Sequence, residues 1–95
     1  MPIKNFSHKG LKELFETGRT GKIGQRYNQR ATDLLDLLDG ATSARDLVGV
    51  CDFHALSGDL EGYYSLHVNG NWTIIFKFEN GDRGDVLDLD FVDYH

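Results

Sequence analysis

The sequence predicts an α+β domain in which two N-terminal helices pack on a mainly antiparallel sheet of four to five strands. Apolar residues recur at helical spacing up to about residue 40, and with a period of two from Cys51 onward. Asn69-Gly70-Asn71 and Asn80-Gly81-Asp82 separate alternating apolar runs and are typical of hairpin turns. The 95 residues suffice for one domain, 1–95, with a single modest core.

The N-terminal part begins with a short predicted strand, Ile3–Phe6, in which apolar and polar residues alternate. Ser7 is then expected to cap a first helix, and Gly18 to end it. One face of this helix is apolar and comprises Leu11, Leu14 and Phe15.

A second helix is predicted over Lys22–Asp39, with Gly40 at its end. Its apolar positions at helical spacing are Ile23, Tyr27, Ala31, Leu34, Leu35 and Leu38. Ser43 and Asp46 have the spacing of a capping box, which predicts a short helical turn through Leu47.

Four strands are predicted in the remainder of the chain, over Phe53–Leu56, Gly62–Val68, Trp72–Phe78 and Val86–Val92. In the third, Ile74, Phe76 and Phe78 should face the core, opposite Thr73, Ile75 and Lys77. Alternation therefore predicts that the Trp72 and phenylalanine side chains contribute to packing rather than to binding.

The net charge of −5 is unevenly distributed. Residues 1–30 contain seven Lys and Arg against two acids, a net +5, whereas residues 31–95 carry a net −10. A local basic surface can bind nucleic-acid phosphates even on an acidic protein. The same cations also suit the solvated faces of two amphipathic helices, so charge alone leaves both interpretations open.

Cysteine content and hydropathy limit the possible environments. The single cysteine, Cys51, excludes an intramolecular disulfide, and no Cys/His spacing resembles a zinc site. No apolar run approaches the roughly 18 residues of a membrane span. We therefore expect a cytoplasmic protein without membrane association, metal or cofactor.

Several motifs in a fixed order resemble the HigB toxins, the plasmid-maintenance killer branch of the RelE/ParE superfamily of type II toxin–antitoxin modules. The motifs are His8-Lys9-Gly10-Leu11, His54-Ala55-Leu56-Ser57-Gly58-Asp59, Gly62-Tyr63-Tyr64-Ser65, Val68-Asn69-Gly70-Asn71-Trp72 and Asp93-Tyr94-His95. The resemblance implies a microbial-ribonuclease-like domain that cuts mRNA on the ribosome. It also implies inhibition by a cognate antitoxin that carries a helix-turn-helix DNA-binding domain.

The resemblance also implies site residues. His54 matches the histidine of the family's His-Pro-Leu-Lys-Gly segment, and the terminal triplet matches Asp93, Tyr94 and His95. These four are the expected catalytic residues. Substrate-binding positions are Ser57, where the family usually has Lys, and Thr73 and Lys77, where it usually has Arg.

Cleavage by attack of a ribose 2′-hydroxyl needs a base, an acid and positive charge around the phosphorus. His54 and His95 would form the proton-transfer pair, because an unperturbed histidine titrates near about 6.5. Asp93 and Tyr94 would position the phosphate or the imidazole. Such a scheme is metal-independent.

The uncharged Ser57 and Thr73 leave a second hypothesis open: a catalytically attenuated homologue that acts as an antitoxin-binding module. Losing one well-placed transition-state donor typically costs on the order of 10²–10³ in rate. A gyrase-poisoning relative of the ParE type is a third hypothesis. That type would not need the terminal Asp-Tyr-His.

Overall fold

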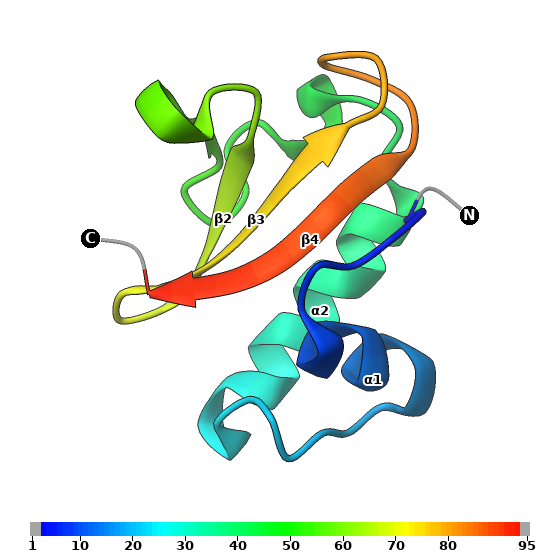
Figure 1. Cartoon of the computed structure of the whole chain (residues 1–95), viewed down its shortest axis with the longest axis vertical. Helices are drawn as coiled ribbons and strands as arrows, with labels where there is room; N and C mark the ends of the chain where they lie inside the picture. The colour runs from blue at the N-terminus through cyan, green and yellow to red at the C-terminus, as the bar shows by residue number, and fades with distance from the viewer. Residues whose placement is uncertain (1–2, 94–95) are drawn as a thin grey trace.

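A computed structural model describes residues 3–93 and confirms the predicted α+β class (Figure 1). The sheet has four strands in the order β1-β2-β3-β4, and every neighbouring pair is antiparallel. The elements are α1 (Lys9–Thr17), α2 (Gln25–Gly40), the 3-10 helix η1 (Ala44–Leu47), β1 (His54–Ala55), the 3-10 helix η2 (Gly58–Leu60), β2 (Tyr64–Asn69), β3 (Trp72–Phe78) and β4 (Val86–Asp93).

Helix α1 is capped by His8 and not by Ser7, so the predicted cap was wrong by one residue. His8 has an extended backbone, and its Nδ1 accepts a hydrogen bond from the Leu11 N–H at 3.2 Å. The imidazole thus satisfies one of the free N–H groups of the first turn, as a serine hydroxyl would. The predicted end at Gly18 is confirmed: its φ is 84°, and its N–H donates to the Leu14 carbonyl.

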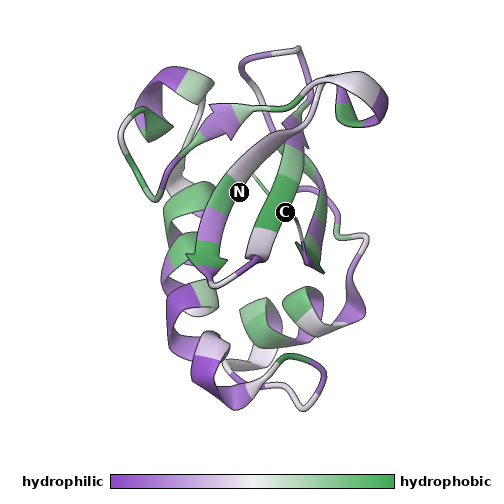
Figure 2. Cartoon of the chain, turned by 90° about the vertical axis from the view of Figure 1, so that its left-hand side faces the viewer, coloured by the Kyte–Doolittle hydropathy of each residue, from purple (hydrophilic) through white to green (hydrophobic). Residues whose placement is uncertain are grey.

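Helix α2 begins at Gln25, three residues later than predicted, because Gly24 is still outside helical geometry with ψ 134°. Its buried face comprises Ala31, Leu34, Leu35 and Leu38. Figure 2 shows the resulting alternation of apolar and polar bands along the helix. None of the helices among residues 3–93 is both long and apolar enough to cross a membrane.

The capping box before η1 is confirmed. The Asp46 carboxylate accepts hydrogen bonds from the Thr42 N–H at 2.9 Å, the Thr42 hydroxyl at 3.1 Å and the Ser43 N–H at 3.3 Å. The Thr42 backbone bond is the main reason that the pKa of Asp46 lies below its ordinary value.

The four predicted strands are present, three of them with shifted ends. β3 has its predicted bounds, β2 starts two residues later, and β1 is shortened to two residues. β1 is confined between a left-handed turn at Cys51 and Asp52 (φ 43° and 59°) and the 3-10 helix η2, whose N-cap is Ser57.

The predicted N-terminal strand Ile3–Phe6 is not a named strand. It makes two isolated parallel bridges to β4, Ile3 with Val86 and Phe6 with Leu89. The Lys4 N–H donates to the Val86 carbonyl at 2.8 Å, so the segment follows the outer edge of β4 (Figure 1). It protects an edge that would otherwise be open to pairing with another chain.

A β-bulge at Asp88 changes the pattern expected for β4. Asp88 has φ 54°, and its N–H donates to the Asn5 Oδ1 at 2.6 Å. Simple alternation would separate Val86 from Leu89, but the extra residue places both on the core face, where each is fully buried.

The core lies between the helices and one face of the sheet, here called the inner face. Its aromatic members pack closely. The Trp72 and Phe91 rings are stacked with their centres 4.8 Å apart, and the Tyr64 and Phe78 rings lie edge to face with their centres 5.6 Å apart. Ile74, Phe76 and Phe78 belong to this core, as predicted. Thr73, Ile75 and Lys77 alternate with them and therefore point to the opposite, outer face.

Candidate active site

The outer face of the sheet carries a row of paired residues that starts at His54. His54 pairs with Ser65, Ser65 with Ile75, and Ile75 with Asp90. Adjacent strands lie about 4.8 Å apart, so His54 and Asp90 are about 14 Å apart across the row. The two ionisable side chains stand at the edges of a strip whose middle, Ser65 and Ile75, is buried.

His54 is exposed, and one of its ring nitrogens is engaged. Nδ1 lies 2.8 Å from the carbonyl oxygen of Asp52. Ser65 is buried, with 1% of its surface exposed, and its hydroxyl oxygen lies 3.4 Å from each of the two ring nitrogens. A carbonyl accepts and cannot donate, so Nδ1 carries the proton and Nε2 has the free lone pair in the neutral ring.

Lys77 supplies positive charge to the same face. It lies two residues along β3 from Ile75, and its Nζ is 4.7 Å from the centre of the Tyr63 ring. An ammonium over an aromatic ring is stabilised by the ring quadrupole, which restricts the lysine to this part of the face.

The two uncharged substrate-binding positions differ in accessibility. Ser57 is exposed at the start of η2, three residues after His54. Thr73 is only 6% exposed, pairs with His67 and Val92, and directs its hydroxyl to the Asn71 carbonyl at 3.4 Å. Neither position brings a charge to the face.

Asp93, the last residue of β4, does not lie on the outer face with His54. Asp93 pairs with Trp72, whose ring packs on the inner face against Tyr27 and Phe91. The register therefore assigns Asp93 to the inner side, opposite His54. Tyr94 and His95 lie outside the described residues.

Sequence reasoning missed Ser65 and Asp90 as members of the His54 face. Ser65 follows two tyrosines in a recognised motif, and its burial beside a histidine depends on the β1–β2 register. Asp90 lies between the buried Leu89 and Phe91, so alternation alone turns it away from the core. The missing signal was the strand register, which pairs Asp90 with Ile75 in the row of His54.

The cations of the first third lie mainly on the helices, away from the His54 face. Some are paired: Lys4 with Glu79 at 2.9 Å, and Lys22 with Glu13 at 3.6 Å. The hydrogen bond to Glu79 raises the pKa of Lys4 above its ordinary value. Both paired lysines lie outside the helices, so their charge is partly neutralised by carboxylates of the same chain.

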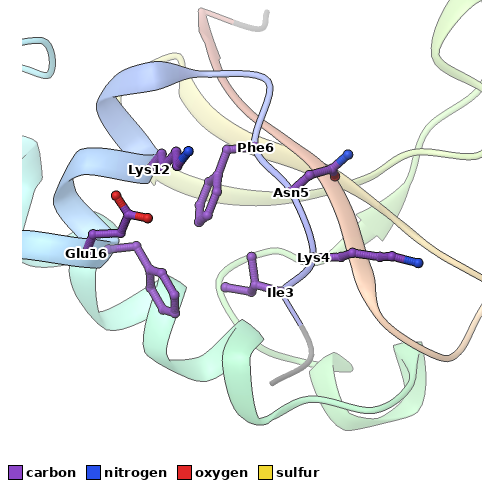
Figure 3. Close-up of a pocket in the computed structure, with 7 residues that line it drawn as sticks. Ile3, Lys4, Asn5, Phe6, Lys12 and Glu16 are labelled. Carbon is purple, nitrogen blue, oxygen red and sulfur yellow. The ribbon is translucent and has the colours of Figure 1, made fainter.

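One apolar groove of the described surface is remote from His54. It is a groove of about 600 Å³ between the N-terminal segment and α1. Ile3 and Phe6 point into it, whereas Lys4 and Asn5 point away (Figure 3). Ile3, Phe6 and Phe15 form its apolar walls, and the ring centres of Phe6 and Phe15 are 5.7 Å apart. None of the described residues that line it is a histidine. Across residues 3–93, no cluster of His, Cys, Asp and Glu could hold a metal ion.

Comparison with known proteins identifies the family of the chain. Residues 4–95 match the family described as the RelE-like toxin of type II toxin–antitoxin system HigB. The chain is 44% identical over 94 residues to the endoribonuclease HigB of Proteus vulgaris, covering 98% of this chain and 99% of that protein. A chain of the YoeB–YefM complex from Staphylococcus aureus has a similar fold, with a TM-score of 0.57, 18% identity, and 98% and 97% of the two chains covered. The protein therefore belongs to the HigB-like toxins, RelE-like toxins of type II toxin–antitoxin systems.

Proposed function

We propose that this toxin is a ribosome-dependent endoribonuclease that cleaves mRNA at the outer face of its sheet, with His54 as the general base. The observation that carries the proposal is the state of the His54 ring. It is exposed, its Nδ1 is engaged by the Asp52 carbonyl at 2.8 Å, and its Nε2 has only the longer 3.4 Å contact to the Ser65 hydroxyl, which a substrate hydroxyl can replace. The activity named for the Proteus vulgaris relative supports the same reaction.

In the proposed reaction, Nε2 of His54 takes the proton of a ribose 2′-hydroxyl. The freed oxygen forms a bond to the adjacent phosphorus, and the bond from phosphorus to the 5′-oxygen of the next nucleotide breaks. His95 gives a proton to that leaving oxygen. The products are a 2′,3′-cyclic phosphate and a free 5′-hydroxyl. Tyr94 is proposed to position the reacting groups, whereas the register directs the Asp93 side chain to the inner side of the sheet, away from them.

Lys77 is proposed to stabilise the charge that develops on the phosphate oxygens. It is the cation that β3 contributes to the His54 face, and its head lies 4.7 Å from the Tyr63 ring. Ser57 and Thr73 would contribute hydrogen bonds only. Electrostatic stabilisation is often the largest single contribution to catalysis. Because Ser57 and Thr73 add no positive charge to that of Lys77, we expect slower cleavage than in a toxin with cations at those positions.

The proposed partners are mRNA on the ribosome and a cognate antitoxin with a helix-turn-helix domain. The structural neighbour is itself part of a complex, YoeB with YefM, and family membership supports a dedicated antitoxin for this chain. We further propose that the protein acts in the cytoplasm, where translating ribosomes are found.

The proposal is tested by mapping new mRNA 5′ ends after expression of the toxin without antitoxin. Wild type should produce discrete cuts within translated codons. His54→Gln and His95→Ala should abolish them, because general acid–base catalysis contributes roughly 10²–10⁴ in rate. His67→Gln is the matched control: His67 lies on the same face, but its Nε2 is 2.8 Å from the Gly70 carbonyl. Cuts that persist in His54→Gln would reject the assignment.

A second candidate is an attenuated toxin that retains antitoxin binding but cleaves little mRNA. Two positions without charge favour it, the exposed Ser57 and the buried Thr73. For this candidate, well-folded wild-type protein should form a stable complex with the antitoxin but neither arrest growth nor cut mRNA. Cuts from wild-type protein at rates matching the Proteus vulgaris relative would exclude it.

A further inference from the structure

The turn before β1 adopts an unusual backbone. Cys51 and Asp52 are consecutive residues other than glycine in the left-handed region, with φ 43° and 59°. L-residues seldom occupy this region, and such conformations persist only where surrounding structure holds them. Among residues 3–93, Asp88 is the other non-glycine residue with positive φ, and it lies at the β4 bulge.

Contacts on both sides hold this turn in place. The His67 N–H of β2 donates to the Cys51 carbonyl at 2.8 Å, and the Phe53 N–H donates to the Val50 carbonyl at 2.8 Å. The Phe53 ring stacks on the Tyr64 ring, with 5.3 Å between the ring centres and 10° between the ring planes. The turn is therefore fixed to the sheet by its backbone and by the next side chain.

The turn directs the Asp52 carbonyl at His54. The oxygen lies 2.8 Å from Nδ1, a full hydrogen bond. The Ser65 hydroxyl is 3.4 Å from each of the two ring nitrogens, so it favours neither. Of these two contacts, the Asp52 carbonyl alone distinguishes one nitrogen from the other.

We propose that the left-handed Cys51–Asp52 turn is a positioning element for His54, which holds the imidazole in the Nδ1–H tautomer with Nε2 facing the substrate. The catalytic use of Nε2 rests on the proposed function, whereas the tautomer does not. A neutral histidine in the other tautomer would present an N–H to the 2′-hydroxyl and could not accept its proton. The turn thus acts through His54 and need not touch the RNA.

The test is the ¹⁵N NMR spectrum of the imidazoles in protein labelled at histidine, with the His54 signals assigned by their loss in His54→Gln. In wild type at a pH where His54 is neutral, Nδ1 should be protonated and Nε2 unprotonated. A predominant Nε2–H tautomer would overturn the proposal by itself.

Two substitutions at Asp52 separate backbone from side chain. Asn adopts the left-handed conformation readily, so Asp52→Asn should retain the Nδ1–H tautomer without the carboxylate. Valine is β-branched and disfavours this conformation, so Asp52→Val should move the carbonyl and give a mixture of tautomers. An Asp52→Val protein that folds and keeps the pure Nδ1–H tautomer would contradict the role of the turn. If Asp52→Val does not fold, the wild-type spectrum still decides.

Kinetics then test the link to cleavage. Asp52→Val should lower kcat by about tenfold or more with KM little changed, because a general base contributes roughly 10²–10⁴. An Nδ1–H tautomer in a wild-type protein that does not cleave RNA would reject the proposed function alone. An active protein with the Nε2–H tautomer would reject the positioning element alone.

Discussion

Replacing Thr73 by arginine is expected to increase the rate of mRNA cleavage. Thr73 faces the same side as His54, two strands away and two residues further along β3. Strand spacing and rise place the two Cα atoms about 12 Å apart, so a phosphate can lie between their side chains. The arginine stem can lie along the neighbouring Val92 while the guanidinium reaches solvent and substrate.

The magnitude follows from the type of interaction. A preorganised donor aimed at the developing charge is worth about 10²–10³ in rate. Since this guanidinium would be partly solvated at the edge of the face, we expect an increase of about 10- to 100-fold. The gain should appear in kcat more than in KM, because the charge that it stabilises develops in the transition state.

The assay is single-turnover cleavage of mRNA on programmed ribosomes by purified toxin. Thr73→Gln is the matched control, since it adds length and hydrogen-bond donors without charge. Thermal unfolding of both variants checks that the buried position tolerates a long side chain. Equal rates for Thr73→Arg and Thr73→Gln in folded proteins would refute the argument that missing charge limits catalysis.

Three further predictions concern stability. Phe76→Ala should lower the free energy of unfolding by about 3–5 kcal/mol in urea titrations, because the ring is fully buried; a loss under 1 kcal/mol would contradict its central place in the core. His8→Ala should cost about 1 kcal/mol by loss of the α1 cap, whereas His8→Asn should be close to wild type; equal losses would show that the cap is not the cause. The pKa of the Asp46 carboxyl is lower in the folded than in the unfolded protein. The ionised carboxylate therefore stabilises the fold fully above the ordinary pKa of about 3.9, and this stabilisation is lost as the pH falls through the folded-state pKa. Asp46→Asn should therefore reduce stability at pH 7 and lessen the loss of stability on acidification, measured by unfolding across pH; a constant difference at all pH values would contradict this origin.

Local patterns predicted the elements better than their ends. β3 was placed correctly because its seven residues are mostly aromatic and β-branched and lie between two Asn-Gly turns. The cap of α1 was misplaced because serine is the usual capping residue, while the actual cap requires the His8 ring to fold back on the Leu11 N–H.

The site was predicted less completely, because its geometry depends on distant contacts. The row from His54 to Asp90 depends on the register of three strand pairs. The bulge that sets the register of the first half of β4 is joined to Asn5, 83 residues away along the chain. The tight turn at Cys51 and Asp52 is held by His67 of another strand. No local pattern contains these contacts, so the sequence predicted a role for His54 from its motif but could not predict its surroundings.

The parallel contact between the N-terminal segment and β4 affects the order of folding. Lys4 bonds to Val86, and the core receives Val86, Leu89 and Phe91 from β4. Contacts at such large sequence separation form late, because a long loop must close before they stabilise the chain. During synthesis, residues 3–85 would emerge without the strand that completes the sheet. The toxin should consequently remain unfolded until its last strand has left the ribosome, which delays the appearance of active protein relative to the start of its translation.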